Sequence, residues 1–157
     1  MIAIAAAGEG QAPMGAPSPS SAALRVLIAD DSRMFAEALM TSLARDERLE
    51  IVGLAHDGVE AVSLAQELSP DVVLMDLEMP LKDGFDATRE IRQLSPSTLV
   101  IVLTRSDSPE DAHRAREAGA AGFVTKDHTT HELVDSMFEI ASLALAFGAG
   151  PRRAGTN

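Results

Sequence analysis

The sequence predicts an α/β fold, a doubly wound parallel five-stranded sheet with helices on both faces. Five short runs rich in Val, Ile and Leu are spaced along the chain, as expected of strands buried on both sides. A segment with apolar residues at helical spacing follows each run. Parallel neighbours need crossover connections, which helices provide, so this alternation favours a parallel sheet.

The strands and the first three helices follow from these runs and from the residues that bound them. The strands are predicted at residues 24–29, 49–55, 71–75, 98–103 and 122–125. The first helix begins after Ser32, whose hydroxyl can cap it. The second ends near Pro70, and the third, over residues 85–94, ends before Pro96, because proline disfavours helix in the residue before it.

The last two helices differ in their apolar faces. The fourth begins at the cap Ser108 and ends at Gly119, and its inner face is formed by three alanines, Ala112, Ala115 and Ala118. Such a face buries little area, so we expect this helix to be easily displaced. The fifth runs from Thr129 or Thr130 to Phe147 with two adjacent apolar stripes, which form either a broad buried face or a surplus surface for a partner.

Length and composition bound the class of protein. The 157 residues suit one domain, predicted at 24–147, with a flexible Ala/Pro/Gly/Ser-rich arm at 1–23 and a flexible tail at 148–157. The absence of cysteine excludes disulfide scaffolds, thiolate metal sites and cysteine nucleophiles. A net charge of -11 repels polyphosphate, so we expect no direct nucleic-acid binding. No apolar run could span a membrane and the start lacks the basic residues of a secretory signal, so we expect a cytoplasmic protein.

Polar side chains follow four of the predicted strands. Asp30 and Asp31 come after the first, Asp76 after the third, Thr104 after the fourth and Lys126 after the fifth. The carboxyl ends of parallel strands meet at one edge of the sheet, where such folds bind their ligands. The sequence therefore predicts one site with three carboxylates, a hydroxyl and an ammonium group.

This set of groups suits phosphoryl transfer. Three neighbouring carboxylates repel one another unless a cation intervenes, and a hard divalent ion, Mg2+, prefers oxygen ligands. An ionised carboxylate is a nucleophile that needs no base, while the cation and two donors can hold phosphoryl oxygens. Asp76 is the best candidate nucleophile, because it ends the central strand and a loop follows it.

Four segments together resemble the receiver domain of two-component response regulators. They are Ala29-Asp30-Asp31-Ser32, Val73 to Pro80 with Asp83-Gly84, Leu103-Thr104, and Gly122 to Asp127. The resemblance covers about residues 24–147, and its details are closest to the NarL/FixJ-type branch, whose usual DNA-binding domain is missing here. It implies a flavodoxin-like (βα)5 fold with strand order 2-1-3-4-5.

The resemblance also implies a role for each site residue. Asp76 would accept a phosphoryl group from a sensor histidine kinase. Asp30, Asp31, Asp76 and the backbone carbonyl of Glu78 would hold Mg2+. Thr104 and Lys126 would bind the phosphoryl oxygens, and Phe123 would be the switch aromatic that turns inward when Thr104 moves.

We therefore expect a stand-alone receiver that is a binding module and not an enzyme. Its output would be a downstream protein or a homodimer, formed through the fourth helix, fifth strand and fifth helix. Other hypotheses are a phosphorylation-independent adaptor and the receiver part of a longer DNA-binding regulator. A phosphatase of the haloacid dehalogenase type is disfavoured, since Glu78 stands where that class needs an aspartate. Arg105, beside Thr104, either shields the site or points to solvent.

Overall fold

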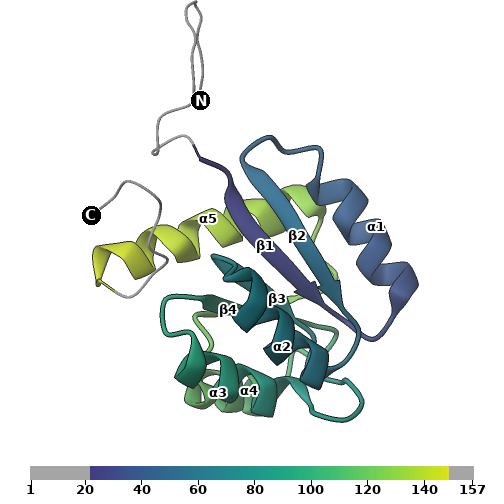
Figure 1. Ribbon diagram of the computed structural model, residues 1–157, viewed down its shortest axis with the longest axis vertical. Coiled ribbons are helices and arrows are strands. Elements are labelled where there is room, and N and C mark those ends of the chain that lie inside the picture. The colour runs from purple at the N-terminus through teal and green to yellow at the C-terminus, as the bar shows by residue number, and fades with distance from the viewer. Residues whose placement is uncertain (1–21, 149–157) are drawn as a thin grey trace, which may run out of the picture.

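A computed structural model describes residues 22–148 as alternating strands and helices (Figure 1). The strands are β1 (Leu24–Ala29), β2 (Leu49–Ala55), β3 (Val72–Met75), β4 (Leu99–Thr104) and β5 (Gly122–Thr125). The helices are α1 (Arg33–Leu43), α2 (Gly58–Leu68), α3 (Gly84–Leu94), α4 (Pro109–Ala118) and α5 (Thr130–Ala146). The predicted arm, 1–23, and tail, 148–157, lie outside the described residues apart from Ala22, Ala23 and Gly148.

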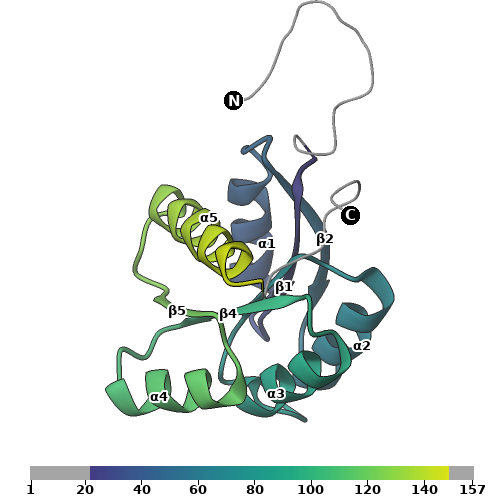
Figure 2. The ribbon, with the colours of Figure 1, turned by 90° about the vertical axis from the view of Figure 1, so that its left-hand side faces the viewer.

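All five strands are parallel and lie in the order β2-β1-β3-β4-β5, which confirms the predicted fold. Helices α1 and α5 cover one face of the sheet, and α2, α3 and α4 cover the other (Figure 2). The chain reverses its winding direction beside β1, so the loops after β1 and β3 lie next to each other at the carboxyl edge. That edge is where the predicted site residues lie.

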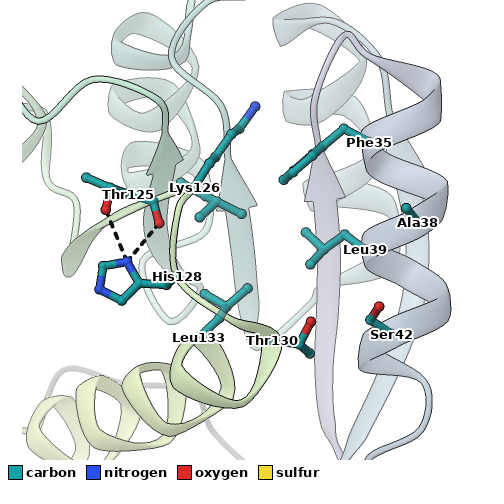
Figure 3. Close-up of a pocket in the computed structure, with 10 residues that line it drawn as sticks. Phe35, Ala38, Leu39, Ser42, Thr125, Lys126, His128, Thr130 and Leu133 are labelled. Atoms are coloured by element: carbon teal, nitrogen blue, oxygen red, sulfur yellow. Dashed lines mark hydrogen bonds between the residues drawn. The ribbon is translucent and has the colours of Figure 1, made fainter.

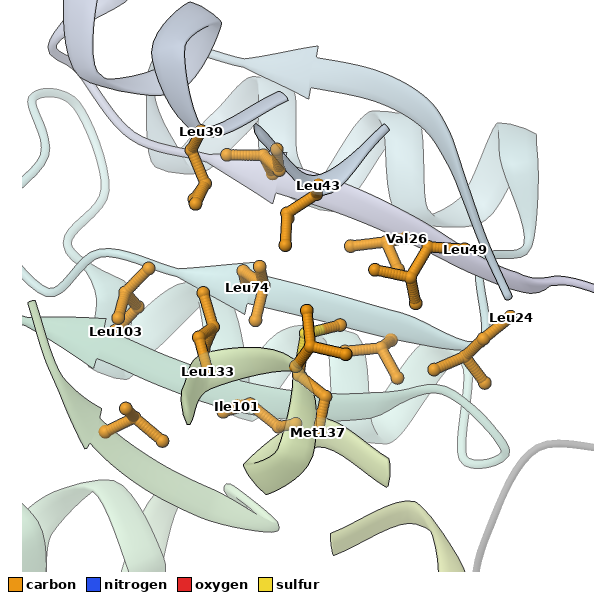
Figure 4. Packing of buried hydrophobic residues seen from close by; sticks show 14 of the residues in the cluster. Leu24, Val26, Leu39, Leu43, Leu49, Leu74, Ile101, Leu103, Leu133 and Met137 are labelled. Carbon is orange, nitrogen blue, oxygen red and sulfur yellow. The ribbon is translucent and has the colours of Figure 1, made fainter. Parts of the chain in front are cut away.

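The strands are buried on both faces because apolar side chains occupy both sets of alternating positions. On the side of α1 and α5, the core brings together Leu39 and Leu43 from α1, Leu74 from β3 and Met137 from α5 (Figure 4). On the other side, Leu27, Val73 and the alanines of α2 form a second core. Packing on both faces holds the strand ends in place for the site.

Side-chain caps set the helix starts where the sequence predicts them. The hydroxyl of Ser32 accepts the Phe35 N–H at 3.2 Å, and Thr129 forms a capping box with Glu132 at the start of α5. The fourth strand, Leu99–Thr104, begins and ends one residue later than predicted, because Thr104 still pairs with Thr125 of β5.

The apolar surplus of α5 is mostly buried. Both stripes contribute to its packed face, through Leu133, Val134, Met137 and Ala141. The ring of Phe138 lies under the Arg48 guanidinium, 4.5 Å from its carbon atom, which is a cation–π contact within the domain. Leu143, Leu145 and Phe147 are exposed at the end of the helix. The two apolar stripes therefore form one broad buried face along most of α5, and its large exposed apolar side chains lie in the last turns.

Between Ala22 and Gly148, no helix combines the length and the apolar character needed to cross a membrane.

Candidate functional site

The carboxyl edge of the sheet brings the adjacent Asp30 and Asp31 together with Asp76, which lies more than forty residues further along the chain. One carboxylate oxygen from each lies within 4.8 Å of the others. Asp30 and Asp76 are 2% and 7% exposed, whereas Asp31 is open to solvent. Three hard oxygen donors with one open side are a donor set that fits a divalent cation such as Mg2+.

Lys126 lies in the same site and is bound to Asp30. Its ammonium nitrogen is 2.6 Å from Asp30 Oδ2 and 3.6 Å from Asp76 Oδ1, and its side chain is 8% exposed. The ring of Phe35, from α1, lies 4.3 Å from the same nitrogen. The buried lysine thus offsets part of the negative charge, and the aromatic face adds a cation–π contact.

The Asp76 carboxyl group has a raised pKa. Burial raises its pKa from 3.8 to about 6, and the neighbouring charge of Asp30 adds to this effect. Lys126 and a hydrogen bond from the Glu78 backbone N–H oppose the rise. Above pH 6, Asp76 is ionised and held in a poorly solvated position, where a bound cation would favour its charged form.

The loop between β3 and α3 holds Asp76 from the other side. The Gly84 N–H donates to the Leu77 carbonyl at 2.8 Å, closing the loop over Asp76. A Cβ on Gly84 would overlap the Asp76 carbonyl oxygen, so the close approach requires glycine. Leu81 takes a left-handed φ of 70° and is 82% exposed, which makes it a strained and solvated leucine at the rim.

Thr104 is buried at 3% exposure, and its hydroxyl faces the loop that follows β4. The Thr104 Oγ1 atom accepts the Ser106 N–H at 3.2 Å. Arg105, which directly follows Thr104, is exposed. The half-buried ring of Phe123 packs beneath α4 against an apolar cluster that includes Phe85 and Ala115.

His56 is a residue of the site that the sequence analysis does not identify. It directly follows β2 and is half-buried, with its Nδ1 atom 3.3 Å from the Asp30 carbonyl oxygen. Its own N–H donates to the Glu60 carboxylate at 2.8 Å. The signal was its place after a strand, at the same edge as the aspartates.

A cavity of about 180 Å³ lies beside Lys126, between α1 and the start of α5. Phe35, Leu39 and Leu133 form its apolar wall, and Lys126 and His128 lie at its polar side (Figure 3). The His128 Nδ1 atom is bonded to Thr125, at 3.0 Å from the carbonyl oxygen. Lys126 lines the cavity and also contacts Asp30 and Asp76, but none of the three aspartates lines the cavity.

Comparisons with known proteins agree on one family. A family model described as the response regulator receiver domain matches residues 26–138. The chain is 36% identical to the chemotaxis protein CheY of Halobacterium salinarum, over 75% of this chain and 97% of that protein. It is 37% identical to the response regulator GacA of Pseudomonas aeruginosa, over 74% of this chain and 55% of that protein.

The fold is equally similar to solved structures. The signal receiver domain of the putative response regulator NarL from Mycobacterium tuberculosis superposes with a TM-score of 0.74 at 33% identity, covering 77% of this chain and 98% of that one. The response regulator domain of CheB from Thermotoga maritima gives a TM-score of 0.69 at 32% identity, covering 82% of this chain and 99% of that domain. The chain spans 55% of the length of GacA, 58% of the probable transcriptional regulatory protein NarL of Mycobacterium tuberculosis and 52% of the uncharacterized transcriptional regulatory protein YxjL of Bacillus subtilis.

Proposed function

Since the chain belongs to the response regulator receiver family of two-component signalling, we propose that Asp76 accepts a phosphoryl group from the phosphohistidine of a sensor kinase. The observation that carries the proposal is the position of Asp76. Its buried carboxylate stands at the carboxyl edge of the sheet, among two other aspartates and a lysine, and the neighbouring strand β4 ends at Thr104.

The transfer needs only an ionised oxygen at Asp76. A carboxylate oxygen attacks phosphorus, the new oxygen–phosphorus bond forms, and the bond from phosphorus to the donor imidazole nitrogen breaks with its electron pair leaving on the donor. The surrounding chain keeps most of the carboxylate out of water, so its charge is poorly solvated before the reaction. At pH 7 and above no proton has to leave Asp76, because a group with a pKa of about 6 is then mostly ionised.

Receiver domains generally bind Mg2+ at an acidic cluster, and here Asp30, Asp31 and Asp76 would hold it. We assign the backbone carbonyl of Glu78 as a further ligand, which follows from the family resemblance. When bound, Mg2+ neutralises the carboxylates and the oxygens of the incoming phosphoryl group. The exposed carboxylate of Asp31 leaves a side open to solvent and to a donor.

Lys126 and Thr104 would respond to the new charge. A phosphoryl group on Asp76 replaces the single charge of the carboxylate by nearly two negative charges, beside an ammonium that lies 3.6 Å from Asp76. The Lys126 ammonium would then divide its contacts between Asp30 and the phosphoryl oxygens. The Thr104 hydroxyl would turn from Ser106 toward the phosphoryl group, and Phe123 would move into the space beside it.

We propose that the output is a change in a protein-binding surface on α4, β5 and α5, read by a downstream protein or by a second copy. Receiver domains interact with histidine kinases and downstream targets. The thin packing of α4, which buries only Ala115 and Ala118, suits a movable surface. The acidic charge disfavours nucleic acid as the direct partner. On this proposal the protein is a cytoplasmic binding module and not an enzyme.

A second candidate is the receiver part of a longer transcriptional regulator. It is favoured by one observation, that the chain covers only 55% of GacA and 58% of the probable transcriptional regulatory protein NarL of Mycobacterium tuberculosis. The chemistry at Asp76 would be the same in either case, and the output would pass to a DNA-binding domain.

The test is intact mass after incubation with acetyl phosphate and Mg2+. The wild type and Asp107→Asn, which removes an exposed carboxylate outside the cluster, are expected to gain one phosphoryl group. Asp76→Asn, and the wild type in EDTA, are expected to gain none. Equal labelling of Asp76→Asn would refute the assignment. Size-exclusion chromatography of the same samples then shows whether labelling changes the oligomeric state.

A further inference from the structure

A chain of hydrogen bonds runs from Thr104 to the first turn of α4. The Ser106 N–H donates to Thr104 Oγ1 at 3.2 Å, and the Ser106 hydroxyl donates to Asp111 Oδ2 at 2.8 Å. The same Ser106 oxygen accepts the Ser108 N–H at 3.1 Å. Ser106 thus bonds at once to the threonine of the site and to α4.

Ser108 continues the chain into the helix itself. It is the N-cap of α4, and its hydroxyl accepts the N–H groups of Glu110 and Asp111 at 3.2 and 3.3 Å. A shift of Ser106 therefore acts on two elements of the helix start, the cap residue and the carboxylate of Asp111. A charged acceptor makes the bond from Ser106 to Asp111 stronger than one between neutral groups.

The fully buried side chains of α4 lie beyond its first turn. Its buried side chains, Ala115 and Ala118, lie in the later part of the helix and are small. The Arg114 guanidinium lies 3.9 Å from the centre of the Phe85 ring, again beyond the first turn. In the first turn, where Ala112 is only half-buried, we expect the hydrogen bonds of Ser106 and Ser108 to fix the position of the helix start.

We propose that Asp111 is a positioning residue that holds Ser106, and through it the Thr104 hydroxyl, in the arrangement seen here. The coupling rests on the proposed function, in which the Thr104 hydroxyl turns toward a phosphoryl group on Asp76. That turn takes away the acceptor of the Ser106 N–H, and Ser106 then releases Asp111 and the cap of α4. The helix start is the first part of the surface to receive the signal.

Glu110 provides a matched control for Asp111. Both are acidic residues in the first turn of α4, and the backbone N–H of each donates to Ser108. Replacing either by alanine removes the same charge from the same end of the helix dipole. The carboxylate of Asp111 accepts from Ser106, whereas the Glu110 side chain is exposed. A difference between the two variants therefore reports the bond to Ser106.

The experiment is amide hydrogen exchange over residues 109–118 in the full chain, with and without beryllofluoride and Mg2+. Beryllofluoride is the probe named for the activated DrrB receiver domain. Before its addition, Asp111→Ala is expected to exchange about 2- to 10-fold faster than the wild type in the first turn, the loss of one net hydrogen bond. Glu110→Ala is expected to stay near the wild type.

Beryllofluoride is expected to speed exchange there in the wild type and in Glu110→Ala, and to change Asp111→Ala much less. Asp111→Asn, which keeps an acceptor oxygen, is expected to restore most of the response. Equal exchange in Asp111→Ala and Glu110→Ala, or a full response in Asp111→Ala, would overturn the proposal. If acetyl phosphate fails to label the wild type, the proposed phosphorylation of Asp76 is refuted. The comparison of variants without beryllofluoride does not depend on phosphorylation and tests the hydrogen-bond chain alone.

Discussion

Replacing Asp76 by asparagine is expected to stabilise the metal-free protein against unfolding. In the folded chain the carboxylate is buried beside Asp30, which raises its pKa from 3.8 to about 6. The folded state therefore binds the Asp76 proton more tightly than the unfolded state does. Below about pH 4 Asp76 is protonated in the folded state and does not reduce the free energy of unfolding. This free energy falls as the pH rises from about 4 to about 6, and above that range the reduction caused by ionised Asp76 is complete.

The size of the penalty follows from the two pKa values. Each tenfold change in proton affinity corresponds to about 1.4 kcal/mol, so ionising Asp76 in the folded state costs about 3 kcal/mol at neutral pH. Asparagine has nearly the same shape and carries no charge, and so it avoids this cost. The favourable charge of Lys126 is already included in the raised pKa of Asp76, and the cost of burying the polar asparagine amide reduces the gain. We expect a net stabilisation of about 2 kcal/mol.

The assay is urea unfolding in EDTA, followed by circular dichroism because the chain has no Trp or Tyr. The gain should be present at about pH 7.5 and lost at about pH 4. Adding Mg2+ should narrow the difference, since binding stabilises the wild type through its complete carboxylate set. The control, Asp107→Asn, should change the stability by less than about 0.5 kcal/mol. A destabilised Asp76→Asn, or a gain that does not vary with pH, would refute the electrostatic argument.

Three further substitutions test other parts of the site. Lys126→Ala should lower the free energy of unfolding in EDTA by about 3 kcal/mol, because it leaves the buried Asp30 carboxylate without its ammonium partner. Urea unfolding measures this free energy, and a loss below about 1 kcal/mol would contradict the prediction. Gly84→Ala should displace the loop that holds Asp76 and so weaken Mg2+ binding, which titration calorimetry measures. An unchanged Mg2+ affinity would show that the loop accommodates the extra methyl group without moving Asp76. Leu81→Asn should raise the urea midpoint and increase the free energy of unfolding by about 0.5 to 1 kcal/mol, since asparagine tolerates the left-handed backbone better than leucine. The Leu81 side chain is exposed, so its removal costs little packing. A lower midpoint would show that Leu81 makes stabilising contacts.

The elements and the members of the site could be predicted from the sequence, because both depend on local patterns. Apolar runs marked the strands, and the hydroxyls of Ser32, Ser108 and Thr129 marked three helix starts. Strict alternation implied a parallel sheet, and parallel strands necessarily place their carboxyl ends at one edge. The residues that follow those strands are therefore predicted to lie together.

The partners of those residues were decided only by the tertiary structure. Lys126 binds Asp30, 96 residues away, more closely than it approaches Asp76. His56 lies against the Asp30 carbonyl, and Arg48 covers Phe138 on α5. Sequence periodicity records which face of an element is apolar, but a hydrogen bond or ion pair depends on distances between segments that meet only after the sheet has formed and the helices have packed on it. For that reason the sequence predicted the chemistry of the site, and the packing determined which charges pair within it.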